Sequence, residues 1–405
     1  MTSRVLVCDD EPDEAKQWLD EIDKALPAGT YELRPVPSLD EIKKAIQVLL
    51  RRRATSSEAR DHRQSICLFD EADVLVIDYD LLHIDETNIR YTGEGVARLA
   101  RAFSQCGVVV VLNQYVEAQF DLGLRGHFES FADLNIDGAL IGTEGLWRVG
   151  PWTNFRPWHW PVLDRAWRQF RDRVTFLSDS GNLSRPILQM LRMTKGDAEH
   201  LSDTAFGLLA PTAESYDRIA KWTFAEFLRD NSAAVDTRGT NALIQNNPAA
   251  SARFVASRVA KWLEREVLGP QDVLVDIPHL IQRCPFLLRG DITDLGTWNR
   301  AVHGGRDDLQ ETVPASAWFG MDDWLSRPAV WWHQLEVHEP FREARAAFDY
   351  GSAPDFVFLE DASQFAPLDE ATEFRAGFHN HYDRRYLKLF EGVRYAPQRR
   401  LAFGA

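Results

Sequence analysis

The chain has 405 residues, of which 45% are hydrophobic and 26% charged, and its formal net charge at pH 7 is -15. This length is enough for more than one domain with a core of its own. The negative charge argues against a broad nucleic-acid interface, and no apolar stretch approaches the roughly 20 residues that span a bilayer. Because the N-terminus shows no signal-peptide pattern and the four cysteines form no CxxC pair, we expect a cytoplasmic protein with buried thiols.

Two short apolar segments near the N-terminus each end in carboxylates. Residues 5–8 run into Asp9 and Asp10, and residues 74–77 run into Asp78. Segments this short, rich in Val and Ile, are typical of buried strands in a parallel sheet. Functional groups of such sheets gather at the carboxyl ends of the strands, so we expect the three acids to lie together. They would offer hard oxygen ligands for a divalent cation and one carboxylate as a nucleophile.

The segments that follow alternate between helix and strand patterns. Strands are expected over residues 5–8, 31–36, 74–77, 108–112 and 138–141. Helices are expected between them, beginning near residues 12, 38 and 93. Ser38 and Glu41 have the spacing of a helix capping box. This order predicts an α/β fold with a flavodoxin-like, doubly wound, parallel five-stranded sheet, since parallel crossovers are right-handed.

Residues 1–145 resemble the receiver domain of response regulators, the CheY-like family, in the order of their elements and in the placement of their acids. The resemblance implies that Asp9, Asp10 and Asp78 hold Mg²⁺ and that Asp78 accepts a phosphoryl group from a histidine kinase. It also implies that Asn113, at the end of the fourth expected strand, contacts the phosphorylated product. On this basis the chain is expected to be a two-component signalling protein.

Two departures from the family pattern leave this expectation open. Receivers carry Ser or Thr where this chain has Asn113, and they carry Lys where Gly142 and Thr143 follow the fifth expected strand. No lysine occurs between Ala45 and Thr194. Loss of a cationic partner removes charge stabilisation from a phosphorylated centre. One interpretation is an atypical receiver that still binds a cation and phosphate, and the other is a pseudo-receiver that serves as a docking scaffold.

Residues 146–161 are rich in tryptophan and proline. Proline prevents a continuous helix here, and tryptophan buries a large area, so we expect a packed strap between domains rather than a free tether. An aromatic ligand patch is the alternative. The strap would join the receiver-like domain, residues 1–145, to a helix-rich effector or interaction domain, residues 162–405.

The second domain is expected to be mostly helical with a small β element. The 3.6-residue apolar spacing predicts helices over residues 163–176, 183–193, 216–228 and 252–267. Short strands are expected over residues 273–275, 356–359 and 393–403. Core packing explains the apolar stripe of the helix over 252–267 without a cofactor.

Some polar groups of this domain are candidate ligands. Asp276 and Glu360 each follow an apolar strand pattern, and His379 and His381 lie in a ligand-rich segment. None of them forms a recognised catalytic motif such as HExxH. A regulatory protein is therefore the leading interpretation, with a histidine kinase or another signalling protein as partner and homodimerisation possible. The alternatives are an enzyme with a metal-dependent hydrolytic site in this half, and a non-catalytic assembly subunit.

Overall fold

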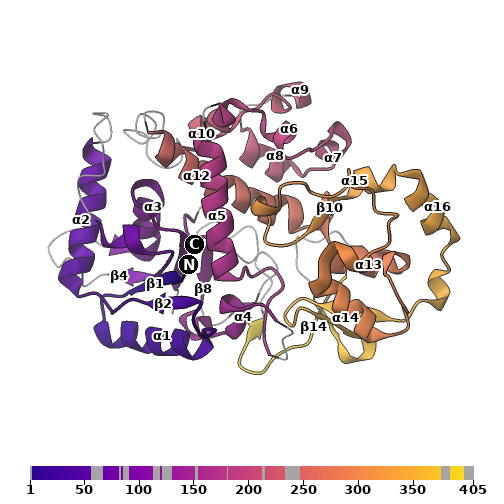
Figure 1. The fold of residues 1–405 in the computed structure, drawn as a ribbon, viewed down its shortest axis with the longest axis horizontal. Coiled ribbons are helices and arrows are strands. Elements are labelled where there is room, and N and C mark those ends of the chain that lie inside the picture. The colour runs from indigo at the N-terminus through magenta and orange to yellow at the C-terminus, as the bar shows by residue number, and fades with distance from the viewer. Residues whose placement is uncertain are drawn as a thin grey trace.

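Strands and helices alternate along the first part of the chain, and helices dominate the second. The structure, a computed structural model, describes residues 2–55, 67–81, 84, 91–112, 119–120, 130–150, 154–179, 181–211, 215–232, 247–374 and 384–395. In Figure 1 the N-terminal sheet lies at one end of the molecule and the C-terminal half at the other, with the long helix α5 (Leu163–Ser178) between them.

The N-terminal sheet has five parallel strands in the order β2-β1-β3-β6-β8. Its strands are β1 (Ser3–Cys8), β2 (Tyr31–Leu33), β3 (Val74–Asp78), β6 (Val108–Leu112) and β8 (Leu134–Ile136). This is the flavodoxin-like order, in which the first and third strands flank the point where the chain changes direction. The predicted fold class is confirmed.

Helices cover both faces of this sheet. They are α1 (Pro12–Ala25), α2 (Leu39–Thr55), α3 (Gly93–Phe103), the short α4 (Glu144–Trp147) and α5. Successive strand residues point to opposite faces. Accordingly, Val5 and Val7 pack with residues of α1 and α5, whereas Leu6 and Cys8 pack with residues of α2 and α3. The predicted capping box at the start of α2 is present, because Ser38 and Glu41 exchange backbone and side-chain hydrogen bonds.

The predicted position of the fifth strand was wrong. The strand β8 ends at Ile136, and residues 138–140 form a 3-10 helix capped by the Asp137 side chain, which accepts a hydrogen bond from the Ala139 N–H. The chain turns at Gly138 because the Trp18 indole packs there, and a Cβ atom at this position would approach that ring to 2.5 Å. Asp137, rather than Gly142 and Thr143, therefore follows the last strand.

The C-terminal half is mostly helical and carries a small β element, as predicted. Its helices are α6 (Ile187–Met190), α7 (Lys195–Glu199), α8 (Asp203–Leu209), α9 (Tyr216–Ile219), α10 (Phe224–Ser232), α12 (Pro248–Trp262), α13 (Ile277–Arg283), α14 (Leu295–Gly304), α15 (Trp332–Glu336) and α16 (Glu339–Ala347). A π-helical turn, Leu263–Leu268, follows α12. None of the helices in the described ranges combines the length and apolar character that crossing a bilayer requires.

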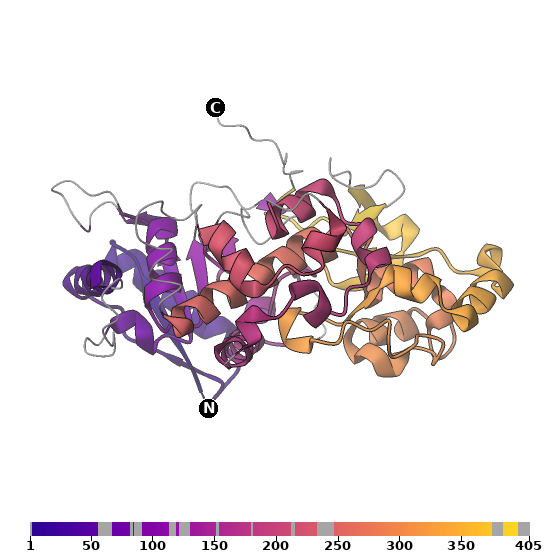
Figure 2. The ribbon, with the colours of Figure 1, turned by 90° about the horizontal axis from the view of Figure 1, so that it is seen from above.

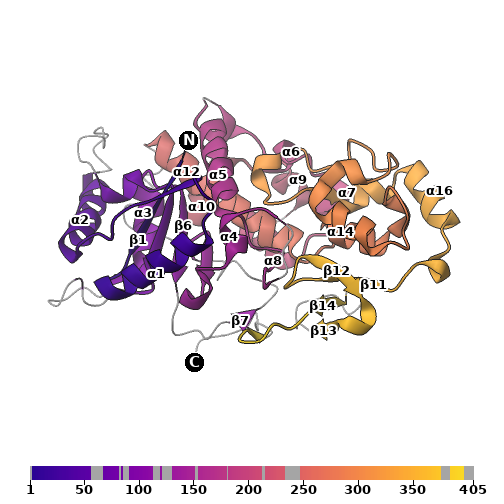
Figure 3. The ribbon, with the colours of Figure 1, turned by 60° about the horizontal axis from the view of Figure 1, so that its bottom comes forward.

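The β element of this half consists of several short pairings. The antiparallel strands β9 (Leu274–Asp276) and β10 (Ala329–Trp331) form one pair. A four-stranded sheet has the order β12-β11-β14-β13 and is visible at the lower right of Figure 3. Its strands are β11 (Phe356–Leu359), β12 (Gln364–Pro367), β13 (Thr372–Phe374) and β14 (Arg385–Leu387).

Two short pairs complete the strands of the described residues. They are β4 (Asp80–Leu81) with β5 (Tyr91–Thr92), and β7 (Gln119–Phe120) with β15 (Arg394–Tyr395). The second pair joins residues that are far apart in the sequence. Only residues 394–395 of the strand expected over 393–403 are paired, and residues 396–405 lie outside the described part of the chain.

Two of the predicted helices are interrupted. The helix expected over 183–193 is broken at Pro186, which lacks the backbone donor that a helix interior needs. The helix expected over 216–228 consists of α9 and α10, and the second begins at a capping box between Thr223 and Glu226. Local capping chemistry here restarts a helix within a continuous apolar pattern.

The two halves meet along α12, which packs against α5 and also contacts α3. Figure 2 shows α12, in salmon, between the sheet and the C-terminal elements. The apolar stripe predicted for this helix is buried in the core of the second half. It consists of Phe254, Val255, Val259, Trp262 and Leu263.

The tryptophan- and proline-rich segment is packed where the structure describes it. Trp147 and Trp160 are buried against the sheet. The backbone N–H groups of Arg156 and Trp158 donate to the carbonyl oxygens of residues 361 and 360, each at 2.8 Å. The domain boundaries at 145 and 162 stay a prediction. All four cysteines are buried and free, as expected: Cys8, Cys67, Cys106 and Cys284.

Candidate functional site

The carboxyl edge of β1 and β3 gathers three aspartates. Asp9 and Asp10 directly follow β1, and Asp78 is the last residue of β3. One carboxylate oxygen from each lies within 4.8 Å of the other two, and all three residues are buried. The parallel register of the two strands brings the acids together, as the sequence led us to expect.

Backbone and indole donors fix the orientation of these carboxylates. The Glu11 N–H donates to Asp9 Oδ1 at 2.8 Å, and Trp18 Nε1–H donates to Asp9 Oδ2 at 3.2 Å. The Asp80 N–H donates to Asp78 Oδ2 at 2.7 Å. Each donor comes from the residues just after a strand or from the first turns of α1. The strand-to-helix connections therefore position the site.

Helix α3 begins directly beside the third carboxylate. The Gly93 N–H donates to the carbonyl of Tyr79 at 2.7 Å. A Cβ atom at position 93 would lie 2.3 Å from the carbonyl oxygen of Asp78, so only glycine allows this approach. Any shift of the backbone at Asp78 and Tyr79 consequently acts on the first turn of α3.

The site concentrates negative charge where water is largely excluded. Burial together with the nearby Asp9 carboxylate raises the pKa of Asp78 to about 7, against the opposing effect of backbone N–H groups. Burial also raises the pKa of Asp9 to about 6, against hydrogen bonds from Glu11 and Trp18. A divalent cation would relieve this repulsion, and carboxylate oxygens are the ligands that Mg²⁺ prefers. The residues present therefore fit such an ion.

The fourth residue of the expected site, Asn113, lies outside the described residues, as do His379 and His381. Among the described residues, Asp9, Asp10 and Asp78 are the only group of three potential ligands with atoms within 4.8 Å of one another. Comparisons with protein-family models, curated proteins and solved structures found no match. Function must therefore be inferred from the geometry of the chain itself.

A second cluster of charges is buried in the C-terminal half. His279, at the start of α13, hydrogen-bonds Asp276 through Nδ1 and lies 2.7 Å from Glu360 Oε1 through Nε2. Arg385 of β14 donates to Glu360 Oε1 at 2.6 Å. Arg327 Nε donates to the other oxygen of Asp276 at 2.7 Å. The cluster therefore joins β9, α13, β11 and β14.

Positive charge compensates the carboxylates of this cluster. Burial alone would raise the pKa of both, but His279 and Arg327 outweigh it and hold the pKa of Asp276 well below its usual range. His279 and Arg385 similarly lower the pKa of Glu360 to about 2. The sequence had marked Asp276 and Glu360 as candidate metal ligands, whereas the structure engages both with arginines. The contribution of His279 was missed, although its three-residue spacing from Asp276 is a local signal.

The raised pKa of Asp78 predicts that this carboxylate costs stability at neutral pH. Its pKa rises from 3.8 to about 7 on folding, so the folded chain binds the proton more tightly, and stability falls as the pH rises through this window. We expect Asp78→Asn to stabilise the metal-free protein at pH 8 by about 1–2 kcal/mol, allowing for solvent screening, and to have little effect near pH 4. Thermal unfolding with and without chelator measures this effect.

Asp13→Asn, at an exposed position of α1, is the matched control and should leave the melting temperature unchanged. An Asp78→Asn protein that melts at or below the wild-type temperature at pH 8 would contradict the assignment of a repulsive acidic site.

The second cluster predicts the opposite behaviour. Glu360→Gln removes one charge and leaves Arg385 and His279 buried without it, so we expect a loss of about 3–5 kcal/mol in unfolding free energy. Because the folded pKa of Glu360 is depressed from 4.5 to about 2, the wild-type advantage is present above pH 4.5 and lost as the pH falls through about 2. Denaturant unfolding at several pH values measures the difference.

The control is Glu339→Gln, at an exposed pair with Arg342 at 3.2 Å. Such surface pairs contribute about 0–1 kcal/mol, so this variant should unfold like the wild type. Equal effects of the two substitutions would show that the buried cluster does not stabilise the fold.

Proposed function

We propose that this chain is a receiver-like regulatory protein whose acidic site binds Mg²⁺ and controls the helical C-terminal half. The observation that carries the proposal is the grouping of Asp9, Asp10 and Asp78 at the carboxyl edge of a parallel sheet with the order β2-β1-β3-β6-β8. In such sheets this edge is where ligands bind and chemistry occurs. Buried carboxylates with raised pKa values at that edge support a functional role over a merely structural one.

The chemistry that we propose for the site is phosphoryl transfer to Asp78. The ionised Asp78 oxygen attacks the phosphorus of a phosphohistidine donor, the P–N bond breaks, and the imidazole nitrogen of the donor keeps the electron pair and takes up a proton. A bound Mg²⁺ supplies neutralisation of the phosphoryl oxygens. The Asp80 N–H donates to Asp78 Oδ2 at 2.7 Å and so orients this carboxylate. A histidine kinase is the partner that this reaction requires.

A chain of contacts joins the site to the C-terminal half. Glu94, in the first turn of α3, accepts hydrogen bonds from Ser130 Oγ at 2.7 Å and from the amide of Asn135. The carbonyl of Ser130 in turn accepts from Arg258 at 3.2 Å and from Lys261 at 3.0 Å, both on α12. A displacement of α3 at Gly93 would thus reach α12 through a single intervening residue.

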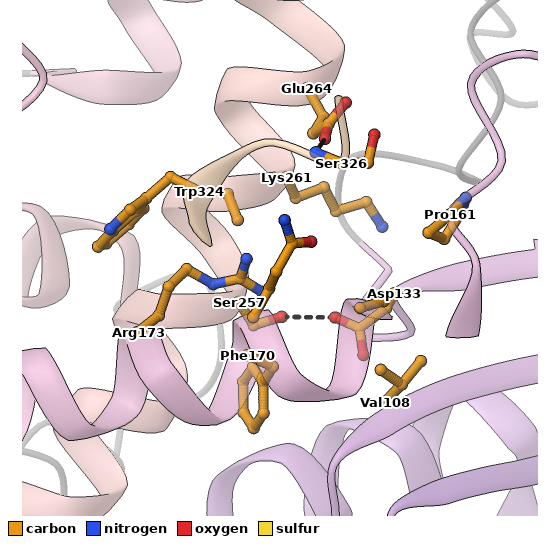
Figure 4. Close-up of a pocket in the computed structure, with 13 residues that line it drawn as sticks. Val108, Asp133, Pro161, Phe170, Arg173, Ser257, Lys261, Glu264, Trp324 and Ser326 are labelled. Atoms are coloured by element: carbon orange, nitrogen blue, oxygen red, sulfur yellow. Dashed lines mark hydrogen bonds between the residues drawn. The ribbon is translucent and has the colours of Figure 1, made fainter. Parts of the chain in front are cut away.

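A second set of contacts runs beside the first. Ser257 of α12 donates to Asp133 Oδ1 at 3.2 Å (Figure 4), and Asp133 forms an ion pair with Arg101 of α3. The Val109 N–H donates to the same carboxylate at 2.8 Å, which ties it to the sheet. Because Arg101 and Ser257 are buried and Asp133 is partly buried, a change at the acidic site would shift packed elements rather than release a tethered domain.

These contacts between α12 and the N-terminal part of the chain also favour a second candidate function, a docking scaffold that never carries phosphate. Extensive contact of α12 with α5 and α3 is what a fixed assembly needs, and no lysine occurs from residue 45 to residue 194. We do not propose a metal-dependent hydrolase in the C-terminal half. Its two described candidate ligands, Asp276 and Glu360, contact arginines.

Phosphorylation is tested by intact mass spectrometry after incubation with acetyl phosphate and Mg²⁺. We expect one phosphoryl adduct on the wild type and on Asp13→Ala, and none on Asp78→Ala, because Asp78 is the proposed acceptor, whereas Asp13 is exposed and lies outside the acidic site. Calorimetric titration with Mg²⁺ accompanies the measurement. Cation binding without an adduct would favour the scaffold, and neither cation binding nor an adduct would sink the proposal.

The coupling is tested by hydrogen exchange on the same proteins. Mg²⁺ with acetyl phosphate should change the exchange of α12 amides in the wild type. In Glu94→Gln this change should be lost while the adduct still forms, because the carboxylate that anchors Ser130 is gone. Glu32→Gln, an exposed position of β2, is the control. An unaltered α12 response in Glu94→Gln would rule out this route.

A further inference from the structure

The indole of Trp18 joins the acidic site to the turn that follows β8. Its Nε1–H donates to Asp9 Oδ2 at 3.2 Å. The opposite edge of the same ring packs against Gly138, where a Cβ atom would lie 2.5 Å from Cη2 and 2.9 Å from Cζ2. One side chain therefore contacts both a proposed metal ligand and a turn that lies far from it in the sequence.

Packing fixes the direction of this indole. Trp18 lies with Ala15 and Ile22 on the buried face of α1, at helical spacing. Its side chain is buried in the core that contains residues of β1 and β8. The turn beyond it is held by the Asp137 side chain, which accepts a hydrogen bond from the Ala139 N–H at 2.9 Å. Because the interior is close-packed, the indole cannot rotate its N–H away from the acidic site without displacing this turn.

The indole N–H in turn restricts the Asp9 carboxylate. Both of its oxygens accept a hydrogen bond, Oδ1 from the Glu11 N–H at 2.8 Å and Oδ2 from Trp18. A carboxylate oxygen has two lone pairs, so each can still bind a cation, and an indole is a donor that offers no competing ligand atom. Trp18 thus holds Asp9 in one orientation while leaving its ligand capacity intact.

A fixed carboxylate does not suit every divalent cation equally. Mg²⁺ requires near-octahedral geometry with oxygens at about 2.0–2.1 Å, whereas Ca²⁺ accepts about six to eight oxygens at about 2.3–2.6 Å in variable geometry. An acid that cannot move serves the strict geometry and hinders the expansion that Ca²⁺ needs. Hydrogen bonds that orient a ligand are typically worth about 10–100-fold in metal affinity. The donor to Asp9 can therefore set which ion the site prefers.

We propose that Trp18 is a positioning residue that holds Asp9 for Mg²⁺ and makes the acidic site prefer Mg²⁺ to Ca²⁺. The inference rests on the proposed function, because it requires that the three aspartates bind a divalent cation. Trp18 acts through Asp9 and is not itself a ligand. The turn at Gly138 supports the indole and is consequently part of what determines the ion preference.

Trp18→Phe tests this inference, because it removes the indole N–H and keeps an aromatic ring in the core. Trp147→Phe is the matched control: Trp147 is buried in the same core, and its Nε1–H donates to the Ile141 carbonyl at 2.7 Å rather than to a carboxylate. Isothermal titration with Mg²⁺ and with Ca²⁺ at pH 8 gives both affinities. We expect Trp18→Phe to weaken Mg²⁺ binding about tenfold and Ca²⁺ binding less than about threefold, whereas Trp147→Phe leaves their ratio unchanged.

Gly138→Ala is a second variant, which pushes the indole out of place while the three aspartates and the N–H remain. We expect it to lower the ratio of Mg²⁺ to Ca²⁺ affinity in the same direction, and it decides the question where Trp18→Phe does not fold. An unchanged ratio in the folded Trp18→Phe protein, or an equal fall in Trp147→Phe, would overturn this inference while the proposed function stands. A wild type that binds no Mg²⁺ would overturn both.

Discussion

Burial of charge at the boundaries between elements is the constraint on which this structure depends. Asp9 and Asp78 are forced together because β1 and β3 are parallel neighbours and end at the same level. The fold gives them hydrogen bonds from backbone N–H groups and one indole, yet the pKa of each stays above its usual value. The energy stored in that repulsion is available to a ligand of opposite charge.

In the C-terminal half, the buried carboxylates are compensated by positively charged side chains. Asp276 and Glu360 are as deeply buried as the N-terminal acids, but arginines and His279 surround them. Lys261 stands between these two cases, since it holds backbone carbonyls together without an ion pair in the described residues. Thus carboxylates with raised pKa values lie at the sheet edge, and a lysine with a lowered pKa lies on α12.

Much of the sheet could be predicted because its signals are local. The apolar runs, the acids that end them and the capping pair of Ser38 and Glu41 all lie within a few residues of one another. The fifth strand was misplaced because Leu134 and Ile136 form only a short apolar alternation, whereas the apolar run that begins at Gly138 is a stronger strand pattern. In the structure this run forms a turn that packs against Trp18. The buried network could not be predicted as a whole, since Arg327 lies 51 residues from Asp276 and Glu360 lies 81 residues from His279. The sequence around Lys261 does not predict its contacts, because its two hydrogen-bond acceptors are backbone carbonyls 129 and 131 residues away.

The contact of Lys261 with Ser130 also bears on how the chain acquires its structure. The segment before the edge strand β8 is anchored by a residue 131 positions later, and Arg156 of the strap is held by Ser363 across 207 positions. Closing loops of this length is slow, and β8 emerges from the ribosome long before α12 does. During synthesis, the edge of the sheet at β8 therefore stays uncovered until α12 has been made. The native contacts of this edge therefore require residues from both halves of the chain.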